Sequence, residues 1–196
     1  SILLFFRIII LSIYFPYNSA NSNKQIRSII YSSLNYSSNY DKLINDFDNY
    51  MSDNFSDTYF SLDDCRKIGF IRQDIEDKFN SGDINARERA LLITSLLYAM
   101  DKIANTCGHY DAYRQGVEFE KHLELYVPQP EPNVNENNVC YNMDTNELAP
   151  EIEADLIYID PPYNSRQYCD AYHLLENVAR WEKPEVFGVA RKMDRT

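Results

Sequence analysis

The sequence is short of positive charge. It has 196 residues, with 19 Lys and Arg against 30 Asp and Glu, so its formal net charge is −11. Proteins that hold nucleic acid by bulk charge need clustered Lys and Arg to neutralise phosphates, and this composition argues against that class. A small basic face remains allowed, because residues 164–196 carry 6 positive and 5 negative groups whereas residues 1–163 carry 13 and 25.

Cysteine and glycine are also scarce, with 4 and 5 residues. The cysteines lie 42, 33 and 29 residues apart, at positions Cys65, Cys107, Cys140 and Cys169. No Cys or His pair has the spacing of metal ligands, and nothing indicates a disulfide framework. The sequence therefore predicts reduced thiols, a cytoplasmic protein and no bound metal. The length and the 44% of apolar residues are ordinary for one globular domain.

Long hydrophobic runs are missing apart from residues 2–15. A membrane helix needs about 20 apolar residues, and this run is shorter. A signal peptide carries its positive charge ahead of the apolar run, whereas Arg7 lies inside it. We therefore expect no membrane segment. Because the chain starts at Ser1 and stops at Thr196 in a charged stretch, we also expect a fragment of a longer protein.

Composition and periodicity divide the chain into four regions. Residues 1–60 are an N-terminal segment without a sustained period, in which the apolar run precedes a polar stretch rich in Ser, Asn, Asp and Tyr. Residues 61–126 are predicted to be helical, and residues 127–138, with three prolines, to be a loop. Residues 139–196 are predicted to be an α/β part that is truncated at its C-terminal end.

Three helices are predicted from apolar residues at helical spacing. The first begins at Ser61, which with the carboxylate of Asp64 resembles a capping box, and ends at an Asn-Ser-Gly sequence. The second covers Ala86–Cys107 and the third covers Asp170–Trp181. Trp181 is expected to be a core anchor.

Two short apolar segments, Val139–Met143 and Asp155–Ile159, are predicted to be strands. A polar loop and a helix follow the second segment. This order is typical of an α/β sheet in which the loops at the carboxyl ends of the strands hold ligands.

The stretch after the second predicted strand carries the chemistry. Asp160 is followed by Pro161, Pro162 and Tyr163. Prolines fix φ and have no amide donor, so they make a stiff corner whose carbonyl groups remain free as acceptors. A carboxylate, rigid carbonyls and a ring face together suit a planar group with an NH₂, such as a nucleobase turned out of a duplex. Because such binding needs no base, His173 is expected to face the helix surface or to pack in the fold rather than to act as a base.

The Asp160–Tyr163 motif, with Asn164-Ser165-Arg166-Gln167-Tyr168 after it, resembles the catalytic motif of adenine-specific DNA methyltransferases of the bacterial restriction–modification type. Three further segments are similar to the same family: Asn105–Tyr110 with the helix before it, Asn142–Leu148, and Ala171–Asn177. The resemblance covers about residues 60–196 and is strongest at the end.

The resemblance implies a partial Rossmann-like α/β fold, with a helical segment inserted before the catalytic strand and S-adenosylmethionine as the methyl donor. Asp160 and the Pro161 carbonyl would hold the adenine amine, Pro162 would stiffen the turn, and Tyr163 would stack on the flipped base. Asp144 would lie near the cofactor. The expected partner is double-stranded DNA with a flipped adenine, in a system that could include a cognate restriction endonuclease. The candidate DNA contacts are Asn164, Arg166, Gln167 and Tyr168.

The sequence departs from the family at its cofactor loop. The family has an aromatic residue followed by Gly-x-Gly, whereas the glycines here form no such sequence. A glycine turn lets the backbone approach a nucleotide cofactor, so we expect this chain alone to be inactive.

Two other readings stay open. One is a non-catalytic truncated remnant or DNA-binding piece of such an enzyme. The other is a protein-glutamine or RNA methyltransferase, which is disfavoured because the resemblance associates Asn with glutamine side chains and Asp with adenine in DNA.

Overall fold

The computed structural model describes residues 47–126, 139, 141, 143–159 and 168–194. These residues belong to two units. The larger contains residues 47–126 and 168–194, and the smaller contains residues 139, 141 and 143–159. The predicted loop at 127–138 and residues 1–46 lie outside the described residues.

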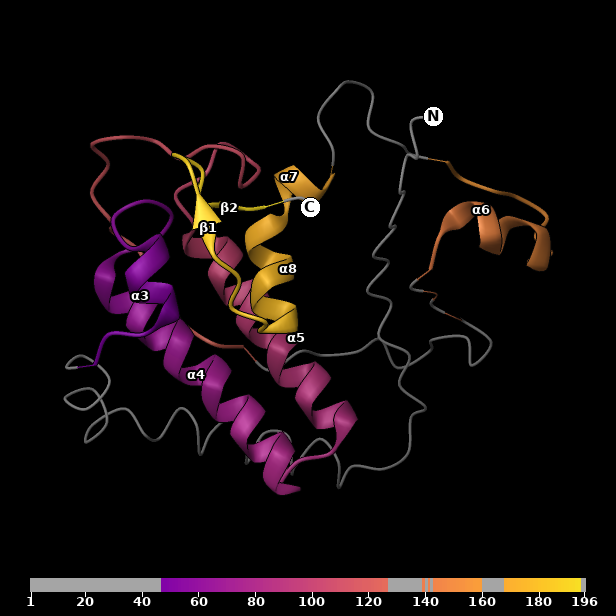
Figure 1. The fold of residues 1–196 in the computed structure, drawn as a ribbon, viewed down its shortest axis with the longest axis horizontal. Coiled ribbons are helices and arrows are strands. Elements are labelled where there is room, and N and C mark those ends of the chain that lie inside the picture. Colours follow the sequence, from indigo (N-terminus) through magenta and orange to yellow (C-terminus); the bar gives the residue numbers. More distant parts are fainter. Residues whose placement is uncertain (1–46, 127–138, 140, 142, 160–167, 195–196) are drawn as a thin grey trace. The chain divides into compact units, whose positions relative to one another are not determined.

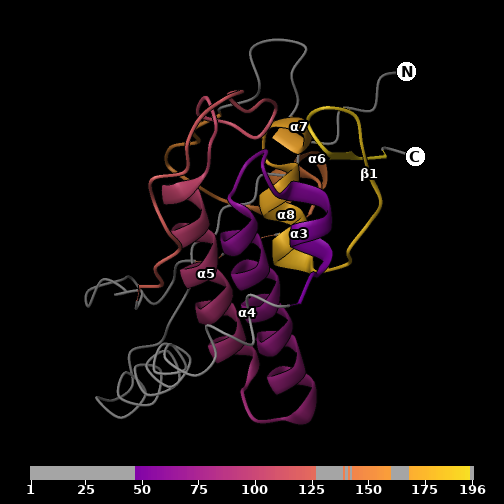
Figure 2. The same ribbon diagram turned by 90° about the vertical axis from the view of Figure 1, so that its left-hand side faces the viewer.

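Two long helices form the frame of the larger unit. Helix α4 covers Leu62–Ser81 and helix α5 covers Ala86–Ile103. They run side by side as a hairpin (Figures 1 and 2). Gly82 ends α4 with φ 82°, a left-handed conformation that glycine adopts without strain. Both predicted helices are confirmed, although α5 ends at Ile103 rather than at Cys107.

The predicted capping box at the start of α4 is half correct. The Ser61 hydroxyl accepts a hydrogen bond from the Asp64 amide at 3.1 Å, as expected. The Asp64 carboxylate serves other groups: it accepts from the Ser61 hydroxyl at 2.6 Å and from the Leu123 amide at 2.9 Å. Because Asp64 is buried, its carboxylate is satisfied by fixing the segment after α5 onto the start of α4.

Helix α3, Tyr50–Phe55, was not predicted. Its cap is Asn49, whose side chain accepts from the amides of Met51 and Ser52 and donates to the Arg66 carbonyl of α4 at 3.0 Å. The cap of one helix is therefore bonded directly to the backbone of another. Six residues are too few to show an apolar period, so this helix has little signal in the sequence.

The predicted third helix is two helices. Helix α7 covers Tyr168–Ala171 and helix α8 covers His173–Arg180. The break is at Tyr172, which has φ −124° and ψ 14° and so leaves helical geometry. In the larger unit α8 packs against α5, as both views show (Figures 1 and 2).

Arg72 of α4 holds the C-terminal end of α8. Its side chain is fully buried, and it donates from Nε to the Val178 carbonyl at 2.8 Å and from Nη2 to the Ala179 carbonyl at 3.2 Å. Nη1 pairs with Glu76 at 2.7 Å, and the guanidinium carbon lies 5.4 Å from the centre of the Trp181 ring. A buried guanidinium is costly unless its donors are used. Arg72 uses them on the last carbonyls of α8, which lack partners within that helix.

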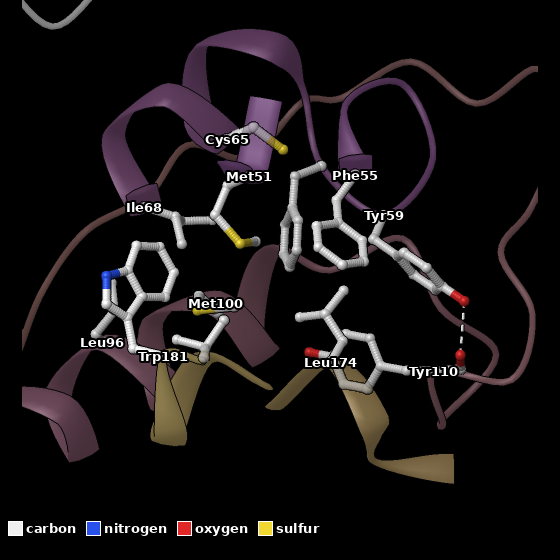
Figure 3. Close-up of a cluster of buried hydrophobic side chains, with 12 residues drawn as sticks. Met51, Phe55, Tyr59, Cys65, Ile68, Leu96, Met100, Tyr110, Leu174 and Trp181 are labelled. Atoms are coloured by element: carbon white, nitrogen blue, oxygen red, sulfur yellow. Dashed lines mark hydrogen bonds between the residues drawn. The ribbon is translucent and has the colours of Figure 1, made fainter. Parts of the chain in front are cut away.

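The core lies where α3, α4, α5 and α8 meet. Figure 3 shows its side chains converging from these helices, with Trp181 at one side and the Tyr59–Tyr110 contact at the other. The predicted role of Trp181 as a core anchor is confirmed, because only 9% of it is exposed. The buried cluster consists of Met51, Phe55, Tyr59, Phe60, Cys65, Ile68, Leu96, Met100, Tyr110, Leu174, Val178 and Trp181.

The predicted strand at Asp155–Ile159 is wrong. The residues of this segment belong to no strand, and the side chains from Leu156 to Ile159 are between 58% and 87% exposed. A strand is stabilised by hydrogen bonds and side-chain pairs with a neighbour, and the described part of the smaller unit offers no such neighbour. The other predicted strand, Val139–Met143, lies partly outside the described residues.

The described residues contain one sheet, an antiparallel hairpin of β1, Val186–Phe187, and β2, Lys192–Met193. The described residues are therefore mostly helical. The sheet expected of a Rossmann-like fold is not seen among them. None of the helices in these residues is both long and apolar enough to cross a membrane.

We predict that Gly69→Ala destabilises the larger unit. A Cβ at Gly69 would lie 1.9 Å from Oδ1 of Asn49, so the Asn49 side chain would have to move away from the α3 amides and the Arg66 carbonyl that it bonds. We expect a loss of about 1–3 kcal/mol in the free energy of unfolding, measured by urea titration. In a background with Asn49→Ala, which removes the clashing atoms, Gly69→Ala should add no further loss. A gain in stability from Gly69→Ala alone, as at an open helical position, would contradict this packing.

Candidate functional site

Most of the predicted site lies outside the described residues. This holds for Asp160, Pro161, Pro162 and Tyr163 of the motif, and for Asn164, Arg166 and Gln167 after it. Two predicted site residues are described: Asp144 in the smaller unit and Tyr168 in the larger one. Because these two residues belong to different units, each is described by its own surroundings.

Asp144 is the N-cap of a short helix. Helix α6 covers Thr145–Leu148 and continues into a 3₁₀ turn, η1, at Ala149–Glu151. Oδ1 of Asp144 accepts from the Asn146 amide at 2.7 Å and from its side-chain amide at 3.0 Å. Both bonds use one carboxylate oxygen, and among the described residues no bond is seen to the other.

Tyr168 is the first residue of α7 and the fifth residue after the Asp160–Tyr163 motif. Its ring centre lies 6.0 Å from that of Tyr172, and the two planes are tilted by 45°. Tyr168 is 39% exposed and Tyr172 is 46% exposed. The two rings therefore form a partly exposed aromatic pair on the helix that continues the motif, which is the kind of surface that nucleobases stack on.

Tyr110 fixes this helix. In the sequence, Tyr110 was noted only as part of the Asn105–Tyr110 segment that is similar to the family, and no role was predicted for it. Its amide donates to the Ala171 carbonyl of α7 at 2.8 Å. Its own carbonyl lies 2.8 Å from Nε2 of His173 and accepts from the Tyr59 hydroxyl at 2.6 Å (Figure 3). The backbone of one loop residue thus bonds to both sides of the break between α7 and α8.

Of the two placements expected for His173, packing in the fold is the one observed, because only 2% of it is exposed. A carbonyl oxygen can only accept, so Nε2 carries the hydrogen and Nδ1 does not in the neutral ring. Nδ1 is buried and has no hydrogen-bond partner in the part of the chain that the structure describes. Burial, followed by the charge of Lys192, lowers the pKa of His173, while its backbone hydrogen bond acts in the opposite direction.

Lys192 of β2 connects the same loop and helix by charge. Its ammonium group pairs with Asp111 in the loop and lies 3.5 Å from Oδ1 of Asp170 in α7. Asp170 is 8% exposed, so this pair is screened little by water. The hairpin, the loop and α7 are therefore held together immediately beyond the predicted motif.

No metal site is found in the described residues, where no three His, Cys, Asp or Glu side chains gather. The described cysteines, Cys65, Cys107 and Cys169, form no disulfide with one another. The two exposed ones lie in the loop after α5 and in α7.

Residues 15–194 match the D12 class N6 adenine-specific DNA methyltransferase family. The chain belongs to this family. The matched range contains both the Asp160–Tyr163 motif and the helices described above. The resemblance that these residues carry is therefore confirmed at the level of the family.

Several curated methyltransferases are similar to this D12 family member. Modification methylase LlaI of Lactococcus lactis subsp. lactis is 38% identical over 135 residues, which are 66% of this chain and 22% of that protein. Modification methylase StsI of Streptococcus sanguinis is 40% identical over 140 residues, 69% of this chain and 21% of that protein. Type II methyltransferase M.FokI of Planomicrobium okeanokoites is 36% identical over 133 residues, which are 66% of this chain and 20% of that protein.

The matched part of the chain spans about a fifth of the length of these relatives. No solved structure is significantly similar to it. Membership of the D12 family implies a methyl donor. This family member fits S-adenosylmethionine only in part. The described residues offer the carboxylate of Asp144 as a hydrogen-bond acceptor. The sequence, however, has no Gly-x-Gly turn that would bring the backbone close to a nucleotide.

We predict that stability falls with acid because of His173. The pKa of the buried imidazole is below its ordinary value of 6.5 in the folded chain, so the unfolded state binds more protons near that pH. The contribution is complete above about pH 6.5 and is lost as the pH falls toward the lower folded pKa, by at most about 1.4 kcal/mol per pH unit. Urea titrations between pH 5 and 8 would measure it.

The matched variant is His173→Gln, which cannot take up a proton in this range. Its stability should change less between pH 6.5 and pH 5 than that of the unaltered chain. Equal slopes in the two proteins would show that His173 contributes nothing to the acid sensitivity.

Proposed function

We propose that this chain takes part in transferring a methyl group from S-adenosylmethionine to the 6-amino group of adenine in double-stranded DNA. The observation that carries the proposal is the family match across residues 15–194, which includes the Asp-Pro-Pro-Tyr motif at 160–163. S-adenosylmethionine supplies an electrophilic methyl group when it is bound. The residues of this chain are assigned the task of holding the base that receives it.

Asp160 and the Pro161 carbonyl accept hydrogen bonds from the two N–H groups of the amine. The lone pair of an adenine amine is delocalised into the ring, so the amine is a poor nucleophile. Acceptors placed for both N–H groups favour a more pyramidal nitrogen, whose lone pair is free to attack. The gain comes from position and preorganised dipoles, with no covalent intermediate on the protein.

Tyr163 stacks on the flipped base and Pro162 keeps the turn stiff. Asn164, Arg166, Gln167 and Tyr168 contact the DNA around it, through phosphates or base edges. The exposure of Tyr168 and of its neighbour Tyr172 supports an aromatic contact on this side of the motif. Asp144, whose second carboxylate oxygen has no bond seen among the described residues, is assigned to the cofactor.

The relatives favour a place in a restriction–modification system. Three of them are described as modification methylases or as a type II methyltransferase. The proposed setting is therefore cytoplasmic DNA, with a restriction endonuclease of the same site specificity as the functional counterpart.

A second candidate function is a non-catalytic remnant or DNA-binding piece. The absence of a Gly-x-Gly turn from the sequence favours it for the chain on its own. Methyl transfer by the 196-residue chain, compared with the longest natural reading frame that contains it, separates the two. Activity that appears only in the longer frame supports the catalytic assignment, and inactivity of both supports the remnant.

We predict that Asp160→Ala, made in that longer frame, abolishes methyl transfer and leaves DNA affinity nearly intact. Asp160 is assigned only to the flipped amine, whereas affinity comes mainly from phosphate contacts. Labelled methyl incorporation and a DNA-binding titration measure the two effects. Unaltered turnover in the Asp160→Ala protein would contradict the assignment.

We predict that Tyr163→Phe is tolerated and that Tyr163→Ala is not. Stacking uses the ring face and is worth about 1–3 kcal/mol per base, which is about 5- to 150-fold in rate if it is made in the transition state. Single-turnover rates compare the two variants. If Phe is as harmful as Ala, the hydroxyl rather than the ring is the functional group.

A further inference from the structure

The junction between α7 and α8 lacks the local groups that normally complete helix ends. Helix α7 has four residues, too few to be stable alone. Helix α8 begins at Tyr172 without a side-chain cap. The chain therefore changes direction, between two helices, at a point where no side-chain cap completes the start of the second helix.

Tyr110 and His173 supply what the junction lacks. The Tyr110 amide bonds to the last residue of α7, Ala171, at 2.8 Å, and the Tyr110 carbonyl receives Nε2 of His173, the first residue of α8, at 2.8 Å. These two contacts fix the end of one helix and the start of the next against the backbone of a single loop residue. Tyr172 in turn donates from its amide to the Tyr168 carbonyl at 2.9 Å, so the junction sets the place of Tyr168.

A buried histidine at this position costs free energy of folding. It is 2% exposed, it leaves Nδ1 without a partner in the described part of the chain, and it lies beside the buried apolar Leu174. A buried polar atom without a partner costs free energy, and an apolar side chain of similar size would avoid that cost. Stability alone therefore does not explain why an imidazole occupies this position. A directed hydrogen bond from Nε2 to the Tyr110 carbonyl does explain it.

We propose that His173 is a positioning residue for methyl transfer: its hydrogen bond to the Tyr110 carbonyl fixes the α7–α8 junction and thereby Tyr168, the residue that joins α7 to the motif. This inference rests on the proposed function. Catalysis by orientation is sensitive to small displacements, since a shift of about 1 Å can cost 100-fold in rate. His173 acts through Tyr110 and touches no reacting atom.

The test compares His173→Gln, His173→Asn and His173→Leu. A glutamine amide nitrogen reaches about as far as Nε2 and can still donate to the Tyr110 carbonyl, whereas an asparagine amide is shorter and leucine has no donor. In the longest natural reading frame that contains the chain, we expect Asn and Leu to lower kcat at least about 10-fold with KM for DNA within about twofold. We expect Gln to stay within about threefold of the unaltered kcat.

Ile75→Ala is the matched control for a general loss of stability. Ile75 is buried in α4 and is not part of the cluster that contains Tyr110 and Leu174. It should lower the unfolding midpoint at least as much as His173→Asn and leave kcat unaltered at a temperature where both are folded. Equal losses of kcat in Ile75→Ala and His173→Asn, or full kcat in His173→Asn and His173→Leu, would overturn the proposal.

Amide hydrogen exchange on the 196-residue chain gives a readout that needs no activity. In His173→Asn, the amides of residues 168–173 and Tyr110 should exchange at least about 10-fold faster, while those of α5 do not change. His173→Gln should resemble the unaltered chain. Unaltered exchange at the junction in His173→Asn would overturn the positioning role. A reading frame without methyl transfer would instead overturn the proposed function, and the exchange result would still decide whether His173 holds the junction.

Discussion

The buried guanidinium of Arg72 is the contact on which the larger unit depends. It reaches from the middle of α4 to the last carbonyls of α8, and its remaining nitrogen pairs with Glu76. Glu76 also pairs with Arg89 of α5 at 2.9 Å, so one carboxylate connects both long helices to the end of the third. Replacing Arg72 would leave the two α8 carbonyls without these donors and would remove one of the two cations that pair with Glu76. We therefore expect substitutions at this position to be strongly destabilising.

Helix α8 is consequently fixed at both ends by groups from outside it. Arg72 holds its C-terminal carbonyls, and the Tyr110 carbonyl holds His173 at its start. A helix of eight residues gains little from its own propensity, so its direction is set by these two contacts and by burial of Leu174 and Val178. The helical hairpin thus serves as the base from which the chain next to the methyltransferase motif is held.

The sequence predicted the features that depend on local patterns. Helices α4 and α5 followed from apolar spacing, the start of α4 followed from its Ser61 cap, and the motif at 160–163 was found by residue type. Burial of Arg72 could not be found, because charged residues are expected outside, and the bonds of Arg72 and His173 could not be found because their partners lie about a hundred and about sixty residues away. Asp155–Ile159 shows the opposite error, since an apolar run favours a strand whether or not a neighbour is present to pair with it.

The central claim is that the motif presents an adenine amine for methylation in DNA. It is tested most directly by incubating the longest natural reading frame that contains this chain with S-adenosylmethionine and mixed-sequence DNA, and then digesting the DNA to nucleosides for mass spectrometry. We expect N6-methyldeoxyadenosine as the methylated product. Methylated cytosine in its place, or methyl groups found on RNA or protein and not on DNA, would contradict it.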